Sequence, residues 1–105
     1  MLDAQYATSY ITSMIKSFRH KGLHRFYEMG SSAGIQPIHK KRLRLQLVAL
    51  DTATLIEDMD IPGFKLHLLK GERRNIWAIS VSGNWRLTFE FRDSNVYLLN
   101  YEDYH

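Results

Sequence analysis

Apolar and polar residues alternate most regularly over residues 85–92, near the carboxyl end of the chain. Four large apolar side chains alternate there with four polar ones: Trp85, Leu87, Phe89 and Phe91 with Arg86, Thr88, Glu90 and Arg92. A period of two is typical of a strand with one buried face and one polar face. The pattern predicts that the apolar set faces the core and that the polar set faces the opposite side of a sheet.

Two further strands are expected beside this one. Residues 76–81 precede it across the turn at residues 82–84, and residues 96–101 follow it across the turn at residues 93–95. Turns this short join antiparallel neighbours. The carboxyl-terminal half is therefore predicted to form an antiparallel sheet.

Two helices are expected before the sheet. Residues 21–29 form the first, weakened at its start by Gly22, and a loop follows at residues 30–34. Pro37 suits the first turn of the second helix, which is expected to run to about Leu50. One apolar face of this helix is marked by Leu43, Leu47 and Leu50.

The remaining segments complete an α+β fold of two N-terminal helices packed on a small antiparallel sheet. Residues 14–18 are a short strand candidate, and residues 51–54 are expected to end the second helix. Residues 65–68 alternate again. That alternation predicts that Leu66 and Leu68 point inward, while Lys65 and His67 join the polar face.

A chain of 105 residues suits one domain, which we place at residues 14–105. Residues 1–13 are small, hydroxylic and almost uncharged, and we expect a poorly ordered extension. A native start at Met14 and a short packed arm are the alternatives. The chain has no cysteine, which excludes disulfides and fits a cytoplasmic location, and no stretch approaches the roughly 20 apolar residues of a membrane span.

The net charge of +3 favours polyanionic partners, nucleic acid foremost. A basic run opens the second predicted helix, where cations oppose the helix macrodipole and are not explained by local stability. We take Lys40, Lys41 and Arg44 as candidate RNA-binding residues; an ordinary solvated face is the alternative. His20 and His24 have a spacing that some zinc sites use, but Gly22 lies between them and no metal site is expected.

The chain ends with Asp103, Tyr104 and His105, directly after the last predicted strand. A carboxylate and an imidazole suit proton transfer, and an aromatic ring outside the sheet suits base stacking. His67 supplies a second imidazole, and Lys70 adds a cation at the end of its segment. These residue types are suited to metal-free chemistry on a phosphodiester, with no cofactor.

Four segments carry a resemblance to a known family: MIKSFRHKGL at 14–23, KLHLLKG at 65–71, NWRLTF at 84–89 and LNYEDYH at 99–105. In this order they closely resemble the HigB-type toxins of the RelE/ParE superfamily of toxin–antitoxin modules. The resemblance implies a microbial-ribonuclease-like fold and ribosome-dependent cleavage of mRNA in the decoding site, which inhibits translation. It also implies a HigA-type helix-turn-helix antitoxin, whose complex with the toxin binds operator DNA.

The same resemblance implies a catalytic set, which is His67, Lys70, Arg86, Asp103, Tyr104 and His105 in this sequence. For these residues we predict transesterification by the 2′-hydroxyl of the RNA, without a metal ion. Residues 1–13 have no counterpart in typical members, and residues 72–75 and 30–36 lie in variable regions. The alternatives are a ParE-like toxin that poisons DNA gyrase without being an enzyme, and a basic RNA-binding module.

Overall fold

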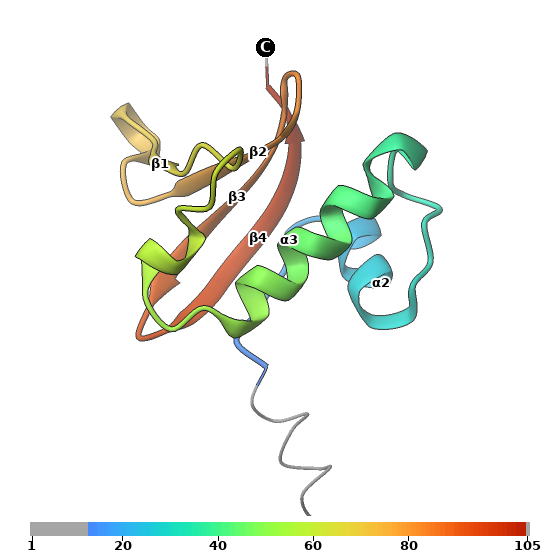
Figure 1. Cartoon of the computed structure of the whole chain (residues 1–105), viewed down its shortest axis with the longest axis horizontal. Coiled ribbons are helices and arrows are strands. Elements are labelled where there is room, and N and C mark those ends of the chain that lie inside the picture. The colour runs from blue at the N-terminus through green and yellow to red at the C-terminus, as the bar shows by residue number, and fades with distance from the viewer. Residues whose placement is uncertain (1–12, 105) are drawn as a thin grey trace, which may run out of the picture.

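The computed structural model describes residues 13–104, so most of the predicted N-terminal extension lies outside it. The helices are α2 (Lys21–Met29) and α3 (Lys40–Thr52), with 3₁₀ turns η1 (Pro37–His39), η2 (Ile56–Met59) and η3 (Gly71–Arg73). The strands are β1 (His67–Leu68), β2 (Trp77–Ser82), β3 (Trp85–Arg92) and β4 (Asn95–Asp103). They form one antiparallel sheet in the order β1-β2-β3-β4, with α3 lying against it and α2 beyond α3 (Figure 1). The predicted fold class is confirmed.

Helix α2 has the predicted bounds and depends on its glycine. The N-cap is His20, whose Nδ1 accepts a hydrogen bond from Leu23 N at 2.9 Å. A Cβ atom on Gly22 would lie 2.8 Å from the Cα of Gly34, and one on Gly34 would lie 2.7 Å from the Cα of Gly22. Gly22 therefore does more than weaken the helix, because it lets α2 and the following loop approach each other closely.

The second helix differs at both ends from the prediction. Residues from Pro37 form the 3₁₀ turn η1 before α3 begins, and α3 continues through Asp51 and Thr52 instead of ending near Leu50. Asp51 does not interrupt the helix because its carboxylate accepts from Ser13 Oγ at 2.8 Å and Met14 N at 3.0 Å. Its polar group is thus satisfied outside the helix backbone.

The predicted strand at residues 14–18 is present only as two isolated parallel bridges to β4, Ile15 to Val96 and Phe18 to Leu99. Between them β4 bulges at Leu98, whose φ is +56° and whose N–H donates to Ser17 Oγ at 2.8 Å. The bulge interrupts regular pairing and explains why no continuous strand forms. Residues 14–18 still cover the edge of β4 that would otherwise be unpaired.

The predicted strands and their turns are confirmed with small shifts at their ends. Two-residue connections join Ser82 to Trp85 and Arg92 to Asn95. In the second, Asp93 and Ser94 both have positive φ, at +52° and +65°. This is the backbone form that matches the twist of an antiparallel hairpin.

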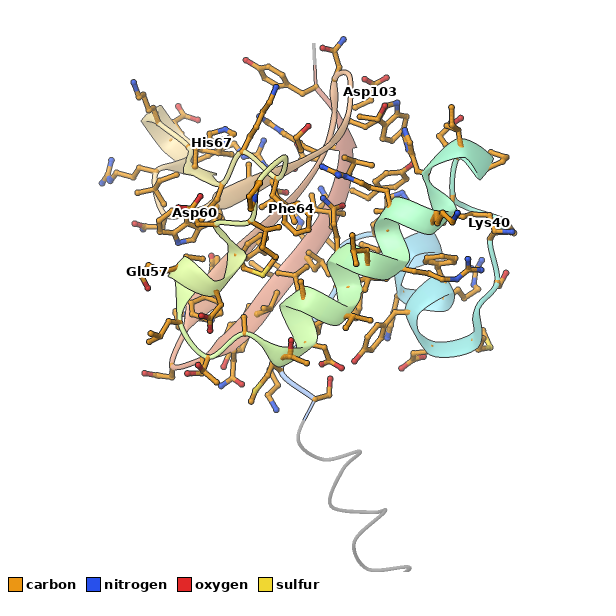
Figure 2. All side chains as sticks on the ribbon, viewed as in Figure 1. Lys40, Glu57, Asp60, Phe64, His67 and Asp103 are labelled. Atoms are coloured by element: carbon orange, nitrogen blue, oxygen red, sulfur yellow. The ribbon has the colours of Figure 1, made fainter. Side chains whose placement is uncertain are left out.

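The edge near β1 departs from the prediction. Leu66 packs against the core as expected, but Leu68 is 44% exposed. The inward prediction for Leu68 is wrong because β1 has only two residues and a partner strand on one side. Before β1, the carbonyl of Phe64 accepts from Ser80 N at 2.7 Å, so this segment also lies along β2 (Figure 2).

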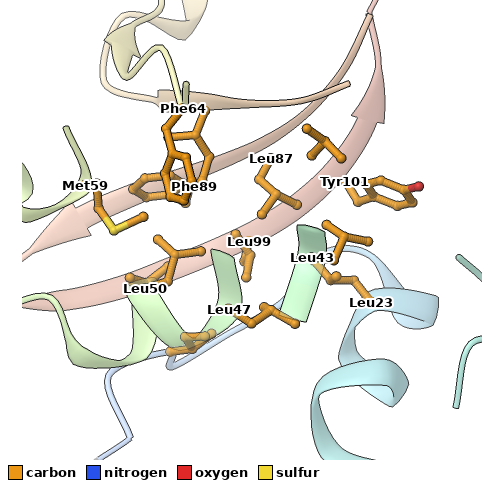
Figure 3. Packing of buried hydrophobic residues seen from close by; sticks show 14 of the residues in the cluster. Leu23, Leu43, Leu47, Leu50, Met59, Phe64, Leu87, Phe89, Leu99 and Tyr101 are labelled. Atoms are coloured by element: carbon orange, nitrogen blue, oxygen red, sulfur yellow. The ribbon is translucent and has the colours of Figure 1, made fainter. Parts of the chain in front are cut away.

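The core lies between α3 and one face of the sheet (Figure 3). The predicted apolar face of α3 is buried there, and Leu87 and Phe89 of β3 are fully buried. Trp85 and Phe91 are partly buried and pack against the same cluster. The alternation predicted for residues 85–92 is therefore confirmed on its apolar side.

Gly22→Ala tests the close approach of α2 and the loop. Intrinsic helix propensity alone would favour alanine by about 1 kcal/mol. The backbone contact at 2.8 Å should reverse that sign and lower the free energy of unfolding by about 1–3 kcal/mol. Chemical denaturation measures this, with Arg25→Ala on the exposed face of α2 as the control; a stabilised Gly22→Ala variant would contradict the account.

Candidate active site

The polar face of the sheet carries the candidate site. Arg86 of β3 is the direct cross-strand partner of Glu102 of β4, and Thr88 is the partner of Asn100. The intervening pair, Leu87 and Tyr101, belongs to the core cluster. The predicted polar face therefore holds Arg86, and it also places an acidic residue beside it.

The guanidinium of Arg86 lies between that acid and the ring of Tyr104. Its Cζ is 4.0 Å from the centroid of Tyr104, and its Nη2 is 3.6 Å from Oε1 of Glu102. The backbone N–H of Tyr104 donates to Asn84 O at 2.7 Å, which continues the pairing beyond β4. Tyr104 is held in this way but is still 55% exposed, so it offers aromatic surface to a ligand.

Two shallow hollows meet at Arg86 and Tyr104. The His67 hollow is lined by Lys65, His67, Ser80, Gly83, Asn84, Trp85, Arg86 and Tyr104. The Lys70 hollow is lined by Leu69, Lys70, Arg73, Arg86, Glu102, Asp103 and Tyr104. Together they bring five of the six predicted catalytic residues to one region of the surface.

His67 has a defined tautomer in this arrangement. Its Nδ1 lies 2.8 Å from the carbonyl oxygen of Lys65. A carbonyl oxygen only accepts hydrogen bonds, so Nδ1 is the nitrogen that carries the proton. In the neutral ring Nε2 is then the nitrogen with a free lone pair, which suits it to accept a proton.

Lys70 is held by the turn that follows β1. It precedes η3 in an extended conformation, and Gly71 after it has φ of +74°. Leu69 N donates to Ile76 O at 2.8 Å and fixes the backbone just before the lysine. Arg73, at the end of η3, reaches the same hollow. The turn thus adds two cations beside Arg86.

Glu102 is the centre of a polar network. Arg73 donates to both carboxylate oxygens, at 3.1 and 2.6 Å, and Thr88 Oγ1 donates at 2.6 Å. Asn100 Nδ2 donates at 3.3 Å. The hydrogen bonds from Arg73, with that of Thr88 and the nearby Arg86 charge, lower the pKa of Glu102 to about 2 in spite of partial burial. Glu102 is therefore ionised at neutral pH.

The tail residues fall at different places. Asp103 is the cross-strand partner of Trp85 and lines the Lys70 hollow. His105 lies outside the residues that the structure describes, so its predicted role stays a prediction. Arg73 and Glu102 were missed by sequence reasoning, although both contact or adjoin predicted residues. Glu102 could be found only from its cross-strand pairing with Arg86, and that pairing depends on the bulge in β4.

The predicted RNA-binding cations lie elsewhere. Lys40 begins α3, far from His67 in Figure 2. Arg44 has its Cζ 5.4 Å from the centroid of the Phe26 ring. Two neighbours in the basic run have structural contacts instead: Arg42 donates to Gly63 O and Ser80 O, and His39 is buried against Tyr101. The patch of Lys40, Lys41 and Arg44 is thus separate from the two hollows.

The remaining histidines have local contacts. His20 caps α2, and burial lowers its pKa. His24 stacks on Phe18 at 4.5 Å and lies 3.1 Å from Glu28. Within residues 13–104, no three His, Cys, Asp or Glu side chains gather as a metal site requires. No helix in that range has the length and apolar content to cross a membrane.

The chain is similar to known proteins over most of its length. A family model described as the RelE-like toxin HigB of type II toxin–antitoxin systems matches residues 16–105. The Endoribonuclease HigB of Proteus vulgaris is 48% identical over 92 residues, which cover 88% of this chain and 100% of that relative.

The depressed pKa of Glu102 predicts a pH dependence of stability. A carboxyl group with a folded pKa of about 2 and an ordinary value of 4.5 stabilises the fold above pH 4.5. This contribution is lost as pH falls from 4.5 toward 2. The difference in unfolding free energy between the wild type and Glu102→Gln should therefore shrink over that window. Urea denaturation measures it, and a difference that stays constant down to about pH 2 would contradict the assignment.

Proposed function

The chain belongs to the HigB-like toxins of type II toxin–antitoxin systems, and we propose that it is an endoribonuclease that cleaves translated mRNA on the ribosome. The resemblance found in the sequence is thereby confirmed at the level of the family. The observation that carries the proposal is the placement of Arg86 against Tyr104, with His67 and Lys70 on its two sides. An imidazole suits proton transfer, a cation suits stabilisation of phosphoryl charge, and an aromatic ring suits stacking on a base, so together these groups suit cleavage of an RNA strand.

The proposed reaction is attack of a 2′-hydroxyl on the adjacent phosphorus. The 2′-oxygen loses its proton as it bonds to phosphorus, and the bond from phosphorus to the 5′-oxygen breaks. The leaving 5′-oxygen takes a proton, which yields a 2′,3′-cyclic phosphate and a 5′-hydroxyl. The hydrogen bond from Nδ1 of His67 supports Nε2 as the base. His105 is then the proposed acid, and Asp103 orients an imidazole or takes a proton.

Lys70 and Arg86 are proposed to stabilise the charge that builds up on the phosphoryl oxygens. Arg86 can present two parallel N–H groups to a phosphate, and Lys70 supplies a compact charge. Tyr104 is proposed to stack on a base with the ring surface that Arg86 leaves exposed. No metal ion or organic cofactor has a step in this mechanism.

The ribosome is proposed as the partner that completes the site. The two hollows are shallow and open, so free RNA would be poorly oriented. Holding reactants in a productive geometry can be worth roughly 7–11 kcal/mol. mRNA held in the decoding site would arrive already positioned. The further proposed partner is a HigA-type helix-turn-helix antitoxin, and operator DNA is reached only through that complex.

Mapping of 5′ ends in cellular mRNA after a short pulse of expression tests the function. The wild type should produce cuts in frame within translated codons, and these should vanish when translation is blocked. A Lys70→Ala and His105→Ala double variant should lose them. The matched control is Lys16→Ala with His24→Ala, which removes the same two residue types outside the hollows and should still cut.

Intact mRNA during growth arrest by the wild type would overturn the proposal. DNA gyrase or another bound target would then have to be examined. If cuts persist in the Lys70→Ala and His105→Ala variant, the catalytic roles proposed for these two residues are wrong, but the proposed endoribonuclease activity stands.

A further inference from the structure

We propose that Glu102 is a positioning residue for this reaction, which orients the guanidinium of Arg86 toward the scissile phosphate. This inference rests on the proposed function. Glu102 is not offered as a group that touches the RNA. Its proposed task is to hold Arg86, and beside it Arg73, in one arrangement.

Several side chains hold the carboxylate of Glu102 in place. Its carboxylate accepts hydrogen bonds from the side chains of Arg73, Thr88 and Asn100. The side chain is only 19% exposed, and Thr88 beneath it is 2% exposed. An acid fixed by this many donors has little rotational freedom, so it is a rigid reference point on the sheet.

The second support is the position of Arg86. The guanidinium has the Tyr104 ring on one side, at 4.0 Å, and Glu102 near its Nη2, at 3.6 Å. The arginine side chain is 13% exposed, and its buried Nε bonds to no atom of the described residues. Glu102 is thus an acidic group placed to orient this guanidinium.

The third support is electrostatic. A carboxylate beside a phosphate-binding cation weakens attraction for RNA, since it cancels part of the positive charge. Affinity for RNA therefore does not account for an acid at this place. Orientation of the cation does.

The chain contains an internal comparison. At the other end of β3, Arg92 lies 3.5 Å from Glu90 and 4.2 Å from the centroid of the Tyr97 ring. This trio has the same three residue types, but the Arg92 side chain is 59% exposed, against 13% for Arg86. It lies outside both hollows, so Glu90 serves as the matched control.

The test is single-turnover cleavage of mRNA on programmed ribosomes, with binding to those ribosomes measured separately. Glu102→Gln should lower the cleavage rate about 10- to 100-fold, as expected for a misplaced catalytic cation. Its binding should be unchanged or tighter, because one negative charge is gone. Glu90→Gln should stay within about twofold of the wild type in rate.

A wild-type rate in Glu102→Gln would overturn the inference, and so would a loss of binding that accounts for the loss of rate. If Glu102→Gln fails to fold, Thr88→Val removes one hydrogen bond to the carboxylate. It should lower the rate by a smaller factor without weakening binding, and an unchanged rate again overturns the inference. An inactive wild type would instead reject the proposed function itself.

Discussion

The pairing of β3 with β4 is the constraint on which the other features depend. One set of cross-strand partners, Leu87 with Tyr101, belongs to the core between the sheet and α3. The neighbouring pair, Arg86 with Glu102, lies on the face of the sheet opposite the core. Because successive side chains alternate, the backbone hydrogen bonds that build the core also place the charged groups. Strand pairing and chemistry therefore cannot be separated in this molecule.

The bulge in β4 sets which residues meet. Arg92 is the partner of Asn95, and extending that register without the bulge would place Arg86 opposite Tyr101. The irregularity at Leu98 shifts the pairing by one residue, so Arg86 faces Glu102. The bulge is held by Ser17, which accepts a hydrogen bond from Leu98 N. An N-terminal segment thus contributes to a site that it does not line.

Much of this could be predicted from the sequence, and the rest fails for identifiable reasons. The period of two over residues 85–92 and the short turns predict the sheet, because burial of one face dictates alternation. The family motifs predict His67, Lys70 and Arg86, and the structure brings these three near Tyr104. Glu102 and Arg73 escape prediction because the bulge and the turn at η3 bring them together, and neither leaves a periodic pattern.

We propose that this surface cleaves RNA through the RNA's own 2′-hydroxyl, and only on the ribosome. The most direct measurement uses purified protein and one mRNA, with and without ribosomes, beside an mRNA carrying a single 2′-deoxynucleotide before the scissile phosphate. The ordinary mRNA should be cleaved on ribosomes and carry a 2′,3′-cyclic phosphate at the new end, and no cut should appear at the 2′-deoxy position. Equal cleavage of free RNA, or a cut at the 2′-deoxy position, would contradict this proposal.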